Sequence, residues 1–433
     1  MPLRIGKREF TKQQTIFLSV IGFIILVLLL VLIGVLPGGR DRSEEINLVV
    51  WGVDEDTRPW KTTISRFESS YANINVTYES VDSDNYENEL LNALAAGRGP
   101  DIFMFHSKWL LEHGDKVVPA PSDKIAQEAF RGLFPQVVEE DFVGDGRIYA
   151  MPLSADTLAL VYNRDIFDRR GVVFPPTTWG EFESAVAKIR TFENGALRER
   201  AAAIGGTSAS IPNAVDLLGL MILQEGGTMV NDSFTRADFG QEAENALSRY
   251  TRFANPQNPF YTWSDSFGDA NEAFANEDVA MIFAYPNDVK EIQDINSSVD
   301  LEIAKMPQIN KSNPVNFANY WGLTVSSRAA DTDAAWNFVI FATTDRGNAE
   351  NYATETGHAP ALRSLISSYL NNPDVGVFAE QALTAKSWPQ INDDSVDTIF
   401  NDMIKSVLGG ATMDSAVSDT RAKLNDIIRS YRR

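Results

Sequence analysis

Aromatic and carboxylate side chains follow two short apolar runs of this chain. The run "INLVVW" (46–51) continues into "WGVDED" (51–56), and "DIFMF" (101–105) continues into "FHSKW" (105–109). Such runs predict buried strands, and ligands of open α/β sheets bind beyond the carboxyl ends of the strands. Trp51 and Trp109 are therefore candidates for ligand contact. Phe105 is another candidate, although an aromatic residue at a strand end can equally complete the core.

The elements that would position these side chains alternate along the chain. A helix is expected near 59–72, with Trp60 and Phe67 on one apolar face, followed by a strand over 74–81. The turn "GRGP" (97–100) ends the next helix, because glycine terminates helices and proline blocks their continuation. A strand, helix, strand, helix, strand order predicts an α/β fold with parallel pairing and right-handed crossovers.

The alternation of expected helices and strands continues to the end of the chain. Thr178 and Glu181 have the spacing of a capping box, which predicts a helix start inside "PPTTWGEFESAVAKIR" (175–190). Further helices are expected near 213–225, 241–254, 331–343, 346–355, 394–408 and 412–430, and strands at 201–205, 278–284, 301–306 and 322–326.

The N-terminal segment is the longest apolar run. From Ile16 to Leu36 it contains no charged residue, and at about 1.5 Å per residue it could cross the roughly 30 Å hydrocarbon core of a bilayer. Four basic residues precede it, which favours a cytoplasmic N-terminus. We expect a cytoplasmic stretch (1–14), a single-pass transmembrane anchor (15–37), a linker (38–45) and an extracytoplasmic domain at the cell membrane. A long signal sequence that is later removed is the alternative.

Composition excludes several classes of function. The 433 residues carry a formal net charge of −21, which argues against nucleic-acid binding because that needs a basic surface. The absence of cysteine excludes disulfides and thiolate metal sites, and three histidines in unrelated contexts make a zinc site improbable. We therefore expect no metal and no cofactor.

Motifs of catalysis are also missing from the sequence. We find no G-x-S-x-G elbow, phosphate-binding loop or dinucleotide fingerprint. A glycosidase needs two suitably spaced carboxylates, but among 59 acidic residues some pair can always be nominated. We expect a protein that is not an enzyme, with a cell-surface glycosidase as the alternative.

Six segments occur in an order that resembles a known family. They are "GRGPDIFMF", "IYAMPLSADTLALVYNRDIF", "PPTTWGEFESAVAKI", "EAFANEDVAMIF", "NYWGLTVSSRAADTDAAWNFVIFATT" and "ETGHAPALRS". In this order the chain, from about 46 to 428, resembles the family-1 extracellular solute-binding proteins, the maltodextrin-binding-like receptors of ABC importers. The resemblance implies a periplasmic-binding-protein-like clamshell of two discontinuous α/β lobes. Lobe 1 would comprise 46–154 and 308–356, and lobe 2 would comprise 157–304 and 361–433, with hinge segments near 154–156, 305–308 and 357–360.

The resemblance also implies where a ligand would bind. Asp156 matches a hinge carboxylate that accepts hydrogen bonds from sugar hydroxyls, and Tyr285 or Asn287 would replace a tryptophan that is usual in relatives. Sugars suit such a site, because their apolar faces lie on aromatic rings while carboxylates and amides bind the hydroxyl groups. The expected ligand-binding residues are Trp51, Asp54, Glu55, Phe105, Trp109, Asp156, Trp263, Tyr285, Asn287, Tyr320, Trp321 and Trp388.

The function implied is capture of a carbohydrate, with an oligosaccharide favoured, and its delivery to the permease subunits of an ABC importer. We expect a monomeric receptor that is held at the membrane by its N-terminal helix. A clamshell sensor that signals to a membrane partner is an alternative, and polyamine, phosphosugar or peptide cargo remain alternatives within transport.

Overall fold

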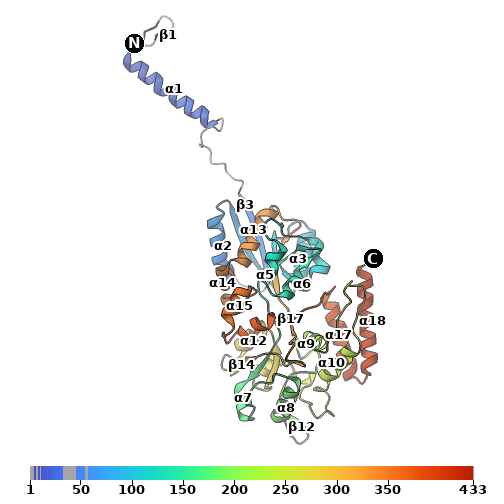
Figure 1. Ribbon diagram of the computed structural model, residues 1–433. Helices are drawn as coiled ribbons and strands as arrows, with labels where there is room; N and C mark the ends of the chain where they lie inside the picture. Colours follow the sequence, from blue (N-terminus) through green and yellow to red (C-terminus); the bar gives the residue numbers. More distant parts are fainter. Residues whose placement is uncertain (1–3, 6–7, 10, 33–44, 54–56, 433) are drawn as a thin grey trace.

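The computed structural model describes residues 4–5, 8–9, 11–32, 45–53 and 57–432 (Figure 1). Asp54 and Glu55 lie outside the described residues, as do the linker residues 38–44. A short pair of strands, β1 (Arg4–Ile5) and β2 (Arg8–Glu9), precedes α1 (Lys12–Leu32). The predicted span runs on to residue 37, and 33–37 are not described. Within the part of the chain that is described, no helix is long and apolar enough to cross a membrane.

The first lobe is built on a six-stranded sheet. Its order is β4 (Ile74–Val81), β3 (Ile46–Val53), β5 (Ile102–His106), β16 (Trp321–Ser326) and β6 (Val117–Val118), and β9 (Met151–Pro152) also pairs with β16. The strand β3 pairs in parallel with β4 and β5, which confirms the pairing expected from the alternation of strands and helices. Asp101 fixes the start of β5, because its Oδ2 accepts a hydrogen bond from Val49 N (2.9 Å) and its Oδ1 accepts one from Ala330 N (2.9 Å).

Helices pack on this sheet and complete the first hydrophobic core. Trp60 stacks on Tyr78 with ring centroids 5.1 Å apart, and Phe67 meets Phe338 edge-on at 5.1 Å, as the apolar face of the second helix predicts. The helices are α2 (Arg58–Ser70), α3 (Tyr86–Ala95), α4 (Leu110–His113), α5 (Gln127–Leu133), α6 (Gln136–Phe142), α13 (Thr332–Thr344), α14 (Arg346–Thr356) and α15 (Arg363–Tyr369).

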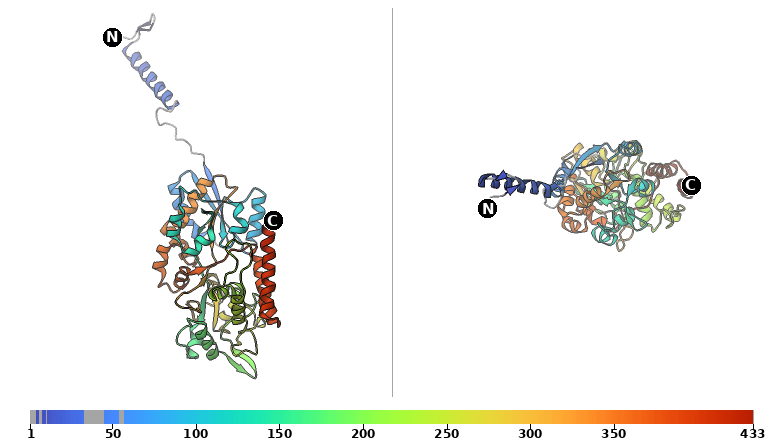
Figure 2. Two further views of the ribbon diagram at one scale, coloured as in Figure 1. Left: turned by 45° about the vertical axis from the view of Figure 1, so that its right-hand side comes forward. Right: turned by 90° about the horizontal axis from the view of Figure 1, so that it is seen from above.

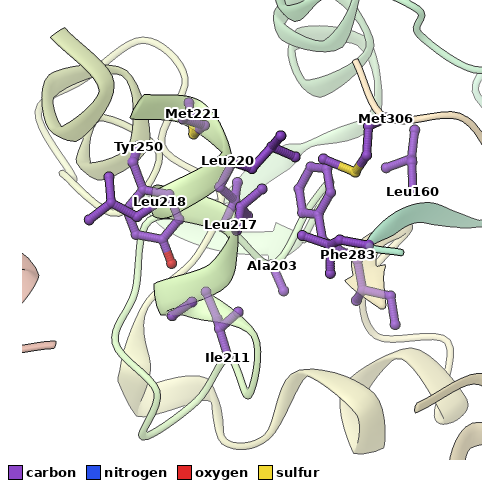
Figure 3. Packing of buried hydrophobic residues seen from close by; sticks show 14 of the residues in the cluster. Leu160, Ala203, Ile211, Leu217, Leu218, Leu220, Met221, Tyr250, Phe283 and Met306 are labelled. Carbon is purple, nitrogen blue, oxygen red and sulfur yellow. The ribbon is translucent and has the colours of Figure 1, made fainter. Parts of the chain in front are cut away.

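The second lobe has its own sheet and its own core. The strands β13 (Met281–Ala284), β10 (Ala159–Asn163) and β14 (Leu301–Ala304) are antiparallel and lie in that order. Figure 3 shows part of the core, where Leu217 and Leu220 face Phe283. The helices are α7 (Arg164–Arg169), α8 (Trp179–Ile189), α9 (Ala214–Gln224), α10 (Gln241–Thr251), α11 (Ala270–Ala275), α12 (Pro286–Ile295), α16 (Gly376–Ala382), α17 (Asp393–Leu408) and α18 (Met413–Tyr431).

Two local predictions differ from the structure in detail. The segment 201–205 is buried but is not a strand: the amides of Ala201 and Ala202 donate to Thr262 Oγ1 instead of to a neighbouring strand. At the start of α8, Thr178 Oγ1 accepts from Glu181 N (3.2 Å) as expected. The Glu181 carboxylate, however, accepts from the amide and hydroxyl of Thr177, so the reciprocal bond lies one residue earlier.

Three segments run side by side between the lobes. The first crossing segment (153–158) is flanked by the second (316–321) and the third (357–360), through isolated bridges from Thr157 to Ala318 and from Ser154 to Pro360. Residues 305–308 lie against the second lobe instead, because Gln308 N donates to Thr177 O (3.0 Å). The first lobe lies above the second in Figure 1 and in the left view of Figure 2, with α17 and α18 along one side.

Candidate functional site

A cavity of about 710 Å³ lies between the two lobes. The chain contributes to it from the end of β3 and the start of α2, from the end of α14 with the third crossing segment, and from α12 of the second lobe. Among the expected ligand-binding residues that the structure describes, only Asn287 lies on its wall. The described lining residues are Val53, Arg58, Pro59, Asn287, Lys290, Glu291, Asp294, Ile295, Glu355, Thr356 and His358.

Asp156 lies at the hinge, next to the wall of this cavity. Its Oδ2 lies 2.7 Å from Nδ1 of His358 and accepts from Ser154 Oγ (2.8 Å), and its Oδ1 accepts from Ala359 N (2.8 Å). Asp156 is only 4% exposed. The carboxylate is thus engaged by the protein itself and ties the first crossing segment to the third.

A second group of polar side chains, the central polar group, also joins the two lobes. Lys108 follows β5 of the first lobe, and its Nζ lies 3.2 Å from Oδ1 of Asp216 in α9 of the second lobe. The other oxygen, Oδ2, accepts from the Tyr285 hydroxyl (2.9 Å) and from Asn319 Nδ2 (2.9 Å). Nε2 of His106 lies 2.7 Å from Asn319 Oδ1, which extends the network into the first lobe.

Electrostatic interactions keep both Lys108 and Asp216 charged. Burial raises the pKa of Asp216, but the Lys108 ammonium and the hydrogen bonds from Asn319 and Tyr285 outweigh it, so the pKa lies below its usual value. Burial likewise opposes the charge of Lys108, but Asp216 and nearby carboxylates raise its pKa overall. Burial, together with the charge of Lys108, lowers the pKa of His106 to about 4, so this imidazole is neutral near pH 7.

Aromatic rings cover one side of this polar group. Trp321 is half-buried and meets His106 edge-on at 4.7 Å, Trp109 at 5.2 Å and Tyr86 at 5.7 Å between ring centroids. Trp51, also half-buried, donates from Nε1 to Glu79 Oε2 (2.8 Å) on the neighbouring strand. Trp109 and Trp321 are therefore brought together, while Trp51 is held against the edge of its own sheet.

Four other expected residues are buried in the cores. Phe105 (0% exposed) and Tyr320 (1%) belong to the first core, and the Tyr320 hydroxyl donates to Asp141 Oδ2 (2.6 Å). Trp263 (0%) and Trp388 (6%) belong to the second core, where Trp263 Nε1 donates to Ser210 Oγ (3.0 Å). A position near a strand end did not expose Phe105, because it lies within the fully buried strand β5 and pairs with Gly322 of β16.

Three residues of the central polar group are not among the residues expected from the sequence. Lys108 lies inside the expected contact segment "FHSKW", in which the aromatic residues are the expected contacts. Asp216 occupies the first turn of α9, where a carboxylate is common for helix electrostatics alone. Asn319 directly precedes the expected Tyr320. Only the spacing of Lys108 from the strand end offered a signal in the sequence.

One group of described side chains has the geometry of a possible metal site. The ligand atoms of Glu87, Glu112 and His113 all lie within 4.8 Å of one another. Existing contacts already engage them, since His113 Nε2 lies 2.7 Å from Glu87 Oε1 and Glu112 Oε2 accepts from Asn392 N (2.6 Å). The arrangement holds α3, α4 and the start of α17 together.

Two α/β lobes, three crossing segments and a cavity between the lobes define a two-lobed binding protein. A family model described as "Bacterial extracellular solute-binding protein" matches residues 62–375. The chain therefore belongs to this family of bacterial extracellular solute-binding proteins, which confirms the resemblance found in the sequence. Because the family consists of binding proteins, the expectation that the chain is not an enzyme is also confirmed.

Relatives are distant but cover most of the chain. A binding protein of Brucella abortus is 23% identical over 400 residues, 89% of this chain and 93% of the relative. The maltotriose-binding protein of Pyrococcus abyssi is 24% identical over 67% of this chain and 60% of its own. Among solved structures, the sugar-binding protein MalE from Xanthomonas citri has a TM-score of 0.74 at 19% identity, covering 89% of this chain and 98% of that one. A solute-binding protein from Thermotoga lettingae bound to tagatose has a TM-score of 0.70 at 22% identity, covering 88% of this chain and 100% of that one.

Proposed function

We propose that this protein captures a sugar, with an oligosaccharide favoured, between its two lobes and delivers it to the permease of an ABC importer. The observation that carries the proposal is the cavity of about 710 Å³ that both lobes line. Pockets of roughly 300–1,000 Å³ are typical of small-molecule sites. The relatives described as binding maltotriose and as sugar-binding support a carbohydrate as the solute.

The two lobes would act as a clamshell. The first lobe is built around the six-stranded sheet and the second around the three-stranded sheet, so the crossing segments near 154–156 and 357–360 form the proposed hinge. A ligand that touches both lobes would favour the closed form by its differential affinity for it. One chain supplies both sides of the cavity, and the proposed receptor is a monomer.

The N-terminal segment would tether the receptor to the cell membrane. Residues 16–36 carry no charge, and the exposed apolar side chains of α1, among them Phe17 and Phe23, suit a lipid environment. A tether restricts the search for the permease to the membrane surface and raises the effective concentration. Alkaline carbonate extraction of membranes tests this proposal: a peripheral protein would be released, whereas the tethered chain would stay in the pellet.

Calorimetric titration of the full chain in detergent tests sugar binding. We expect heat of binding with maltotriose or galacto-oligosaccharides and no chemical change of the recovered sugar. The Asn287→Ala variant should bind at least tenfold more weakly with an unchanged melting temperature, because Asn287 is an exposed side chain on the cavity wall. Asn371→Ala, at an exposed position outside the cavity, is the matched control and should bind as the wild type does. Binding of no sugar at all would contradict the proposal.

A further inference from the structure

We propose that residues 108–112 of the first lobe form a latch that holds the two lobes together without a bound solute, and that this latch must release before a solute enters the cavity. The inference rests on the proposed capture of a solute between the lobes and adds how entry to that site is controlled. It follows from three contacts of one short stretch of the first lobe with the second lobe, and from how firmly that stretch is held in its own lobe.

The buried contact of the latch is the ion pair between Lys108 and Asp216. The Lys108 side chain is 6% exposed and that of Asp216 is 12% exposed, so the pair is shielded from solvent. Among the described residues, Asp216 is also the only hydrogen-bond acceptor of Lys108 Nζ. The carboxylates of Asp393 and Asp397 in α17 attract the same ammonium. Three carboxylates of the second lobe therefore draw this first-lobe residue toward them.

Two further contacts are made by α4, which follows Lys108 closely in the chain. Glu112 Oε2 accepts a hydrogen bond from Asn392 N (2.6 Å), at the start of α17. The carbonyl oxygen of Leu111 accepts one from the hydroxyl of Tyr431, the last residue of α18. Both partners of all three contacts come from the chain itself, so the latch needs no solute to form.

The latch is firmly attached to the first lobe. Trp109, the residue after Lys108, is 5% exposed and stacks on Tyr86 with ring centroids 6.1 Å apart. His113, at the end of α4, is 4% exposed, and its Nε2 lies 2.7 Å from Glu87 Oε1. Because both ends of the stretch are fixed in the first lobe, the stretch cannot stay behind with the second lobe when the lobes separate. Separation has to break its three contacts.

The acceptor of the ion pair is connected to the wall of the cavity. Asp216 Oδ2 accepts from the hydroxyl of Tyr285 (2.9 Å), the residue that precedes α12. Helix α12 supplies Asn287 and Lys290 to the cavity wall, and Glu355 lies on the part of the wall that belongs to the first lobe. Hinge motion that separates two such walls opens a site between lobes to its ligand. Release of the latch therefore controls entry to the cavity.

Removal of the lysine charge should open the lobes. Lys108→Met keeps the length of the side chain but leaves the Asp216 carboxylate without its cation in a buried place, which is strongly unfavourable. Separation of the lobes lets water reach the carboxylate and relieves this cost. Lys311→Met is the matched control, because it removes a lysine from an exposed ion pair with Glu181 inside the second lobe.

The distance between two spin labels, one on each lobe, measures the latch. The chain contains no cysteine, so Asp115→Cys after α4 and Ala422→Cys on α18, both at exposed positions, provide the only two attachment sites. Pulsed double electron–electron resonance on the labelled full chain in detergent should give one short distance, with and without saturating maltotriose. Without sugar, Lys108→Met should lengthen this distance by at least about 5 Å, as hinge opening does. Lys311→Met should leave it unchanged.

Two outcomes of this measurement would overturn the latch. One is a predominantly long distance in the otherwise unchanged chain without sugar, since the three contacts would then not hold the lobes together. The other is an unchanged distance in Lys108→Met.

A second variant keeps the latch testable if Lys108→Met does not fold. Tyr431→Phe removes only an exposed hydroxyl, and the population at the longer distance should rise at least about twofold, the effect of one lost hydrogen bond. Tyr71→Phe, at another exposed tyrosine, is its matched control and should leave the population unchanged. Equal populations in the two tyrosine variants would overturn the latch.

Stopped-flow fluorescence of maltotriose binding tests the control of entry. If the latch must release first, the association rate constant of Lys108→Met should be at least about tenfold higher, because a required conformational change slows association. An unchanged rate constant in a variant whose lobes have separated would overturn the control of entry. If maltotriose binds to neither protein, the proposed function fails, whereas the distances measured without sugar still decide whether the latch exists.

Discussion

Oδ2 of Asp156 lies 2.7 Å from Nδ1 of His358, and this contact joins the first and third crossing segments of the two-lobed fold. The same carboxylate accepts from the amide of Ala359, next to His358. Asp156, which the resemblance implied to be a sugar ligand, thus connects two crossing segments at the hinge in this structure. Any ligand that used Asp156 as an acceptor would have to compete with these internal donors.

Replacement of Asp156 by alanine should destabilise the protein by about 2–4 kcal/mol. The change leaves the His358 ring, the Ser154 hydroxyl and the Ala359 amide without their acceptor in a buried place. Urea unfolding of the full chain in detergent measures the loss. Asp374→Ala, at an exposed position, is the control and should change the free energy of unfolding by less than about 0.5 kcal/mol. A loss of similar size in both variants would show that the contacts of Asp156 do not stabilise the hinge.

Two tryptophans should respond differently to replacement by alanine. Trp263 is fully buried in the second core, and its loss should cost about 3–5 kcal/mol through lost contacts and the cavity left behind. Trp321 is half-buried beside the polar group between the lobes, so Trp321→Ala should cost less stability and more sugar affinity. Denaturant titration and calorimetry on the same two variants measure both quantities. The reverse order of stability losses would contradict the assignment of Trp263 to the core.

Asp141 should make stability depend on pH. Burial raises the pKa of this carboxyl from 3.8 to about 7, despite hydrogen bonds from Ser387 and Tyr320. Between these two values the folded state holds the proton and the unfolded chain does not. The stabilisation is complete below about pH 4 and is lost as the pH rises through 7, with a slope of up to about 1.4 kcal/mol per pH unit.

Comparison with Asp141→Asn isolates this contribution. The variant cannot ionise at this position, so the difference in free energy of unfolding between wild type and variant should change between pH 4 and pH 7 and level off outside that range. Urea titrations at half-unit pH intervals measure the difference. A difference that stays constant between pH 4 and pH 7 would show that the pKa of Asp141 is not raised in the folded protein.

Replacement of Gly322 by alanine should disturb the middle of the first sheet. A Cβ atom at this position of β16 would lie 2.6 Å from Met151 O and 2.7 Å from a ring carbon of Phe142. Relief of that overlap should cost about 1–3 kcal/mol, because strand and ring must both shift. Gly132→Ala in α5 is the control: its Cβ would meet nothing within 4 Å, and alanine should stabilise the helix by up to about 1 kcal/mol. Thermal unfolding should show a lower melting temperature for Gly322→Ala and an unchanged or higher one for Gly132→Ala.

The local elements of this fold could be predicted from the sequence. The strands at 46–53 and 74–81 and the helices α2, α13, α14 and α18 lie within one to three residues of their expected bounds. Hydrophobic periodicity, glycine and proline breaks and caps are local signals, so neighbouring residues suffice to define them. Parallel pairing of β3 with β4 and β5 also followed from the sequence, because strands that alternate with helices pair in this way.

The role of individual aromatic residues could not be predicted in the same way. Trp263 and Trp321 both follow loops or crossing segments in the sequence, yet one is fully buried and the other is half-buried between the lobes. Burial depends on which distant elements cover a residue, and local sequence does not contain that information.

By itself, the sequence determined most of the long helices and strands, the α/β class and the family. Only the tertiary structure decided that Lys108 meets Asp216 and that Tyr285 and Asn319 hold the same carboxylate. These four residues are separated by as many as 211 positions along the chain, from 108 to 319. An ion pair between lobes depends on how the two cores are placed by the crossing segments, and no local pattern of residues encodes that placement.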